Sequence, residues 1–341
     1  MNTLFQPYQF KNLSLRNRVV MAPMCQYSAE DGIANDWHFV HYTSRAIGGV
    51  GLVIVEMTNI EPDGRITDNC LGLWNDKQQA ALKRIVDAVH QHGAKIGIQI
   101  AHAGRKATDA KTPVSASDIA HSERYKTPHA LTTEETEAMV QKYKDTAARA
   151  VAAGFDTIEI HGAHGYLIHQ FQSPSINNRD DKYGQDRSLF GVEVVEAVKS
   201  VMPDDMPLLF RTSVYEFAEG GYDLDYGIDM CKRYVEAGVD MLHVSAGGEG
   251  TPSKSRFTGA YPGYMLNFAR AVKEACDVPV IAVGILDDVS TAEYAVSSGA
   301  SDLAAIGRAL LRDPHWVLNQ GQAIDKSARS FIPEQYERGY Y

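Results

Sequence analysis

Short apolar and β-branched runs recur along the chain, and each is followed by a longer segment in which apolar residues repeat with helical spacing. The runs predict eight strands, over 18–24, 50–58, 95–104, 155–161, 207–213, 239–245, 279–284 and 302–307. Eight strands that alternate with helices favour a closed parallel (β/α)8 barrel, the TIM barrel, with residues 1–341 as a single α/β domain. An open doubly wound sheet is the alternative, but no G-x-G-x-x-G turn follows the first run.

Two of the intervening helices have clear start signals. Over 76–92, apolar residues fall at i, i+3, i+4 and i+7, and Asn75 stands in the N-cap position. A second helix is predicted to begin after Thr132, with Glu135 completing a capping box, and to end near Ala153.

Alternation along the strands separates the side chains that face the helices from those that face the barrel interior. In 95–104 the isoleucines share the outer face, so Gln99 points inward. The same reasoning directs Glu159, His161 and Arg211 inward. Gln99, His161 and Arg211 lie near the carboxyl ends of three strands, so they are expected to meet at the mouth where barrel enzymes carry their active sites.

An inward arginine needs an explanation, because a buried guanidinium is costly to desolvate without a partner. Arg211 implies either an ion pair with Glu159 inside the barrel or an anionic ligand at the mouth. A phosphate site is expected nearby, because Gly307 and Arg308 stand where a helix begins after the last strand and Gly284 ends the strand before it.

The segment HGAHGY places His161, His164 and Tyr166 directly after a predicted strand. A metal site would need a third ligand such as His102 or His243, and the histidine spacing is not the i, i+4 spacing of a zinc protease. A structural histidine pair is a second alternative, but it leaves the tyrosine unexplained.

Charge, the length of apolar runs and cysteine content each argue against a class of protein. The formal net charge is -10 and the basic residues are scattered, so nucleic acid is not an expected partner. No apolar run reaches the length of about 18 residues that a membrane-spanning helix needs, and a cytoplasmic location is expected. The four cysteines form no C-x-x-C pair, which argues against zinc ribbons and iron-sulfur clusters.

Seven segments together resemble the Old Yellow Enzyme family of FMN-dependent ene-reductases, and more narrowly its thermophilic-like bacterial subclass. They are RNRVVMAPMCQYS (16–28), GRITD (64–68), IGIQIAHAGRKA (96–107), AAGFDTIEIHGAHGYLIHQFQSPSINNRDDKYG (152–184), VGI (283–285), IGRALLRDP (306–314) and QYERGYY (335–341). The similarity extends over essentially the whole chain.

The resemblance implies tightly but non-covalently bound FMN at the barrel mouth. It places Arg211 beside the flavin edge that becomes negative on reduction, Gln99 at the pyrimidine edge, and Gly284, Gly307 and Arg308 around the phosphate. The full set of expected flavin contacts is Ala22, Pro23, Met24, Cys25, Met57, Gln99, Arg211, Val283, Gly284, Gly307 and Arg308.

The resemblance also implies the reaction. NADPH or NADH would reduce the flavin, and hydride would then pass to the β-carbon of an α,β-unsaturated carbonyl or nitro compound. His161 and His164 would hydrogen-bond the substrate oxygen, and Tyr166 would protonate the α-carbon. Tyr27 and Lys106 would contact the substrate.

The two ends of the chain carry further expectations. Residues 1–17 would close the bottom of the barrel. The tail 330–341 would reach a neighbouring subunit of a homodimer or homotetramer and offer it Arg338.

Two flavin-free alternatives remain open. One is a phosphate-binding barrel aldolase or isomerase, which does not explain Gln99 and Arg211 together, and the other is a non-catalytic binding barrel.

Overall fold

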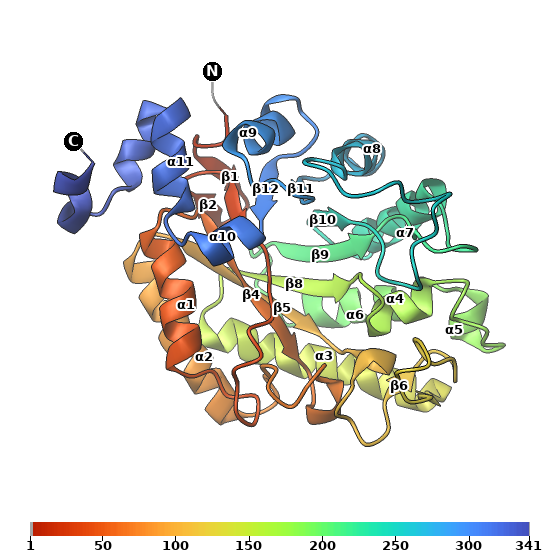
Figure 1. Ribbon diagram of the computed structural model, residues 1–341. Helices are drawn as coiled ribbons and strands as arrows, with labels where there is room; N and C mark the ends of the chain where they lie inside the picture. The colour runs from red at the N-terminus through yellow and green to blue at the C-terminus, as the bar shows by residue number, and fades with distance from the viewer. Residues whose placement is uncertain (1–2, 341) are drawn as a thin grey trace.

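The computed structural model describes residues 3–340; the first two residues of the predicted closing segment and Tyr341 at the end of the predicted tail lie outside the described residues. Eight parallel strands form a closed barrel (Figure 1). They are β3 (Val19–Met21), β4 (Leu52–Asn59), β5 (Lys95–Ala101), β8 (Thr157–Gly162), β9 (Leu208–Ser213), β10 (Met241–Ser245), β11 (Val280–Ala282) and β12 (Leu303–Ile306). The predicted (β/α)8 barrel and all eight strands are confirmed.

Helices surround the barrel (Figure 1). The longer ones are α1 (Asp36–Ile47), α2 (Asp76–Gln91), α3 (Thr133–Ala153), α6 (Leu189–Lys199), α7 (Leu224–Glu236), α8 (Leu266–Cys276), α9 (Val289–Ser297) and α11 (Trp316–Ile324). The shorter ones are α4 (Leu167–Gln172), α5 (Lys182–Gln185), α10 (Arg308–Arg312) and the 3-10 helices η1 (Pro62–Gly64), η2 (Gly104–Lys106), η3 (Lys326–Phe331) and η4 (Glu334–Gly339). Two small sheets pair β1 (Tyr8–Phe10) with β2 (Leu13–Leu15) and β6 (Val114–Ser115) with β7 (His129–Ala130).

Both predicted helix starts are confirmed. Asn75 caps α2, and its side chain accepts a hydrogen bond from the backbone N–H of Gln78. Thr132 and Glu135 form the capping box of α3. Gly154 ends α3 in the left-handed region at φ 89°, a conformation that favours glycine.

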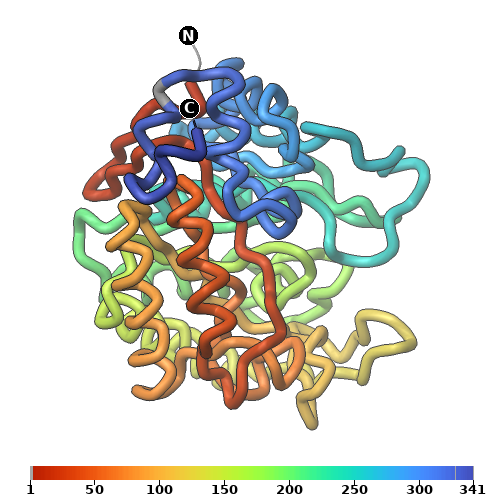
Figure 2. Tube along the Cα trace, turned by 60° about the vertical axis from the view of Figure 1, so that its left-hand side comes forward, coloured from red at the N-terminus to blue at the C-terminus, as the bar shows by residue number. Residues whose placement is uncertain are grey.

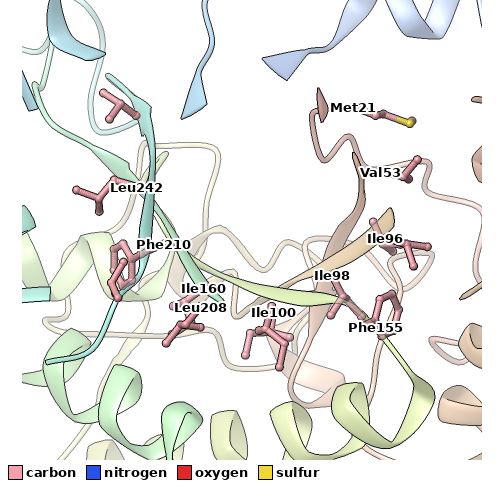
Figure 3. Packing of buried hydrophobic residues seen from close by; sticks show 14 of the residues in the cluster. Met21, Val53, Ile96, Ile98, Ile100, Phe155, Ile160, Leu208, Phe210 and Leu242 are labelled. Carbon is pink, nitrogen blue, oxygen red and sulfur yellow. The ribbon is translucent and has the colours of Figure 1, made fainter. Parts of the chain in front are cut away.

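The apolar side chains form two separate layers. Ile96, Ile98, Ile100 and Ile160 pack in the outer layer between strands and helices (Figure 3). An inner layer fills the barrel, with Leu209, Met241, Ile281 and Leu303 among its members. The inward and outward faces predicted from alternation therefore hold in the folded barrel.

The first and last elements of the described chain lie at one end of the molecule (Figures 1 and 2). Leu13 and Leu15 of the β1–β2 hairpin pack with the inner layer of the barrel, which supports a closing role for the N-terminal segment. The tail beyond α11 lies at the same end of the molecule as the N-terminus (Figure 2). Arg16 lies over the Phe331 ring of the tail, 6.0 Å from its centroid. Within residues 3–340, no helix combines the length and apolarity needed to cross a membrane.

Candidate active site

A cavity of about 320 Å³ opens beside the carboxyl ends of β3, β10, β11 and β12, and we call it the mouth cavity. Its volume lies within the range typical of small-molecule sites. Nine of the residues predicted to form the site line it: Ala22, Pro23, Met24, His164, Arg211, Val283, Gly284, Gly307 and Arg308. Segments that are nearly 290 residues apart in sequence thus build one site.

Arg211 brings a buried positive charge to this cavity. Arg211 is only 8% exposed. Its Nε is buried and has no hydrogen-bond partner among the described residues. Burial lowers the pKa of Arg211, which reflects the cost of removing the charge from water. The described residues show no ion pair between Arg211 and Glu159, whose carboxylate instead contacts Gln99 and His243. The arrangement favours the second of the two explanations, an anionic group of a ligand.

Both glycines line the cavity where a phosphate is expected. Gly284 has φ 123°, and a Cβ there would come within 3.0 Å of the Met265 side chain. Gly307 precedes the first residue of α10, and a Cβ there would contact only the Met24 sulfur, at 3.5 Å. Backbone N–H groups that line such a cavity next to a guanidinium, here that of Arg308, suit a phosphate dianion.

The HGAHGY segment turns sharply after β8 and gathers its three proton-handling side chains. His164 and Gly165 both have positive φ, at 58° and 72°. The His161 ring lies 5.2 Å from the His164 ring and 4.9 Å from the Tyr166 ring, centroid to centroid, edge-on in both cases. Among residues 3–340, no group of three or more His, Cys, Asp and Glu side chains is arranged to hold a metal ion.

Burial sets the protonation of all three side chains. It lowers the pKa of His161 and of His164 well below the usual range, and the Arg211 charge acts in the same direction. Burial raises the pKa of the Tyr166 phenol. At neutral pH the imidazoles are therefore neutral and the phenol keeps its proton.

Hydrogen bonds fix how each imidazole is oriented. His161 Nδ1 accepts from the Ala163 N–H at 3.2 Å, so the proton of the neutral ring is on Nε2. His164 Nε2 lies 2.7 Å from the Ser245 hydroxyl. Ser245 was missed in the sequence, although it shares the inward face of its strand with His243 and alternation could have found it.

A second group of predicted residues lies on the β4 and β5 side of the site. Met57 is buried in β4, beside a register shift between Val55 and Thr58, and packs in one cluster with Cys25 and Tyr166.

Lys106 and Tyr27 each lie next to a member of that cluster, Lys106 beside Tyr166 and Tyr27 beside Cys25. Lys106 Nζ donates to the His164 carbonyl at 2.8 Å and stands 4.9 Å above the Tyr166 ring. Tyr27 is 49% exposed. Lys106 is therefore bonded to the HGAHGY turn, while Tyr27 is open to solvent.

The structure also pairs cysteines that lie far apart in sequence. The Cys25 thiol lies within hydrogen-bonding reach of Cys70, and this contact together with burial raises the pKa of Cys25. Cys231 and Cys276 make a similar contact. All four are free thiols, and spacing alone gave no signal for either pair.

Arg338 is not brought together with the other predicted residues. It lies exposed in η4 and is not among the residues that line the mouth cavity. The tail is held against its own chain through ring contact between Tyr336 and His315, at 5.6 Å between centroids.

Comparison with known proteins assigns the barrel to a family. Residues 3–326 match the model described as "NADH:flavin oxidoreductase / NADH oxidase family". The chain is 43% identical over 342 residues to an NADPH dehydrogenase of Clostridium acetobutylicum, and the match covers 99% of each chain. The chain belongs to this flavin oxidoreductase family, that of Old Yellow Enzyme.

Solved structures agree with that assignment. Morphinone reductase in complex with tetrahydroNAD is similar with a TM-score of 0.80 and 28% identity, over 95% of this chain and 93% of that one. The old yellow enzyme homologue of Zymomonas mobilis gives a TM-score of 0.82 and 26% identity, over 94% and 93%. The expected FMN cofactor, nicotinamide reductant and NADPH dehydrogenase class are confirmed. The flavin-free alternatives are excluded by membership of this family.

The residues present fit FMN. The unpartnered Nε of Arg211 offers a buried donor to a polar flavin edge, and Gly284, Gly307 and Arg308 suit its phosphate. Tyr264, Met265 and Asp287 also line the mouth cavity. They come from loops without periodic pattern, so sequence reasoning missed them.

We predict that Arg308→Gln weakens FMN binding about tenfold or more, because a charge-assisted hydrogen bond contributes roughly 1.5–3 kcal/mol. The matched control is Arg233→Gln, which removes the same charge from α7, where Arg233 is exposed and paired with Asp186, away from the mouth cavity. Dissociation constants for FMN and for riboflavin, which lacks the phosphate, provide the measurement. Equal losses for both flavins, or equal effects of both substitutions, would contradict the phosphate role.

Proposed function

We propose that this flavin oxidoreductase is an ene-reductase, which reduces the C=C bond of α,β-unsaturated carbonyl or nitro compounds with NADPH or NADH as reductant. The observation that carries the proposal is the trio of His161, His164 and Tyr166 beside the flavin cavity, with both imidazoles neutral and the phenol protonated. Bound FMN supplies hydride transfer, first from the nicotinamide and then to the substrate β-carbon.

The two histidines stabilise the negative charge that develops on the substrate oxygen as hydride reaches the β-carbon. His161 donates through Nε2–H, since its Nδ1 is already an acceptor. His164 donates through Nδ1–H if the Ser245 hydroxyl donates to its Nε2. The other neighbour of that hydroxyl is the Met265 sulfur at 3.9 Å, a weak acceptor. Ser245 is thus a positioning residue that sets the tautomer of His164.

Tyr166 gives its proton to the α-carbon and completes the reduction. Its raised pKa makes it a weak acid, but it also keeps the phenol loaded with a proton at neutral pH. Lys106, above the ring, stabilises the phenolate left after transfer. Between about pH 7 and 9, above the usual histidine pKa and below the usual tyrosine pKa, none of the three side chains titrates.

The remaining predicted contacts complete the site. Cys25 adjusts the flavin as a weak thiol donor, with Met57 behind it, and Tyr27 contacts the substrate from the open side. Arg338 reaches the pocket of a neighbouring subunit in a homodimer or homotetramer.

The test is anaerobic reduction of the bound flavin with each nicotinamide, followed by mixing with 2-cyclohexenone, other enones and nitroalkenes. We expect the flavin absorption to bleach with NADPH or NADH and to return on addition of the enone, with the saturated ketone as product. Bleaching that no activated alkene reverses would exclude ene-reductase activity while leaving the flavin oxidoreductase class intact.

We predict that Tyr166→Phe keeps the rate of flavin reduction by NADPH within about twofold and slows reoxidation by an enone about a hundredfold or more, since general acid catalysis typically contributes ~10²–10⁴. Stopped-flow absorbance separates the two half-reactions. In the unsubstituted enzyme the reoxidation rate should stay flat from about pH 7 to 9. Equal slowing of both half-reactions would remove the proton-donor role from Tyr166.

We predict that Arg338→Ala raises the KM for the enone about three- to tenfold and leaves the FMN content unchanged, because a charged contact at a subunit boundary contributes about 1 kcal/mol. Arg329→Ala, in η3 just before the tail, is the control. Steady-state kinetics on the isolated oligomer provide the measurement. A KM that matches the control would confine the tail to its own subunit.

A further inference from the structure

Directly beneath the predicted flavin contacts, the barrel interior holds a buried carboxylate that no step of the reaction uses. Glu159 has no exposed surface. Its Oε1 accepts a hydrogen bond from Gln99 Nε2 at 2.7 Å, and its Oε2 lies 2.7 Å from His243 Nδ1. Gln99 is opposite Glu159 in the β5–β8 register, and His243 is opposite Arg211 in the β9–β10 register. The four side chains form one polar group at the centre of the barrel.

We propose that Glu159 is a positioning residue for FMN, which fixes the orientation of the Gln99 amide and offsets the charge of Arg211. The inference rests on the FMN cofactor that family membership implies and does not depend on the proposed substrate.

The orientation of Gln99 follows from the charge state of Glu159. Burial alone would raise the pKa of Glu159, but His243, Arg211 and Gln99 outweigh it and lower the pKa, so the carboxylate is ionised. Burial lowers the pKa of His243, so its neutral ring donates Nδ1–H to that carboxylate. An ionised carboxylate only accepts hydrogen bonds. The Gln99 amide must therefore turn its NH₂ toward Glu159, which leaves its carbonyl oxygen free.

That free carbonyl matches one atom of the flavin ring. The pyrimidine edge of an isoalloxazine carries one N–H donor between two carbonyl acceptors, and the carbonyl of Gln99 can accept from that N–H. The opposite amide orientation would set two acceptors against each other. Reversing Gln99 would also leave a buried polar group unsatisfied, which is costly.

Glu159 also modifies the field at the mouth. Burial lowers the pKa of Arg211, and the negative charge of Glu159 opposes that shift although the two side chains form no direct ion pair. A positive field favours the reduced flavin, because reduction adds negative charge. Glu159 weakens that field, so its charge lowers the reduction potential of bound FMN.

Two substitutions separate the effect of the Glu159 charge from the effect of its side-chain length. Glu159→Gln removes the charge and keeps the length; we expect the ratio of affinities for reduced and oxidised FMN to rise about tenfold, equivalent to about 30 mV for a two-electron couple. Glu159→Asp keeps the charge and shortens the side chain; we expect about five- to tenfold weaker binding of oxidised FMN with an unchanged potential.

The measurements are a redox titration of the flavin-loaded protein against a reference dye and the release of FMN on dilution, followed by its fluorescence. Asp302→Asn is the charge control, since Asp302 lies before the start of β12, at the opposite end of the barrel, and pairs with Lys273. Gln99→Ala closes a double-mutant cycle: if Glu159 acts through Gln99, Glu159→Asp has no further effect on affinity in that background.

Two outcomes would overturn the proposal. One is a potential in Glu159→Gln that moves no further than in Asp302→Asn. The other is a loss of FMN affinity in Glu159→Asp that is undiminished in the Gln99→Ala background, since that loss would reflect general damage to the barrel. If Glu159→Gln does not fold, the Glu159→Asp cycle alone decides the orienting role.

Discussion

The site depends on the register of parallel strands whose side chains alternate between two faces. Because the barrel is closed, an inward side chain at the carboxyl end of one strand meets its counterpart on the next. Gln99 is opposite Glu159, His161 is opposite Arg211, and Arg211 is opposite His243. A shift of one residue in any of these pairs would exchange the polar side chains for the apolar ones of the outer layer. The apolar packing on the outside thus fixes where the charges stand on the inside.

Contacts between distant loops then hold the turn that carries the histidines. Arg105, in the connection after β5, forms a buried ion pair with Glu249, in the connection after β10. A Cβ on Gly165 would lie within 3.0 Å of the Glu249 carboxylate and closer still to the Gly248 carbonyl oxygen, so glycine is required where the loops meet the turn. The Gly165 N–H also donates to His169 Nδ1 at 2.9 Å, which ties the turn to α4. The strained backbone at His164 is therefore held from several sides.

The parts of the molecule that sequence predicted are those set by local periodicity. Strand alternation placed Gln99, His161 and Arg211 at one mouth, and the capping pattern at Thr132 fixed the start of α3. Contacts that depend on loop paths left no periodic signal, which is why Met265 and the ion pair of Arg105 with Glu249 were not expected. The relation of Arg211 to Glu159 stayed open for another reason: alternation gives the direction of a side chain but not the partner that its polar atoms choose.

Burial has opposite effects on the two kinds of acid in this site, and the proposed chemistry uses both. Removing water disfavours charge, so the histidine pKa values fall and the tyrosine pKa rises. The result is a set of three neutral proton donors at neutral pH, close to a cavity whose one buried guanidinium is permanently charged. Neutral donors neither repel the positive ring of the oxidised nicotinamide that forms on hydride transfer nor compete for the anionic edge that Arg211 attracts. The same pocket can therefore bind first the reductant and then the substrate. None of its own side chains needs to change charge between these two binding steps.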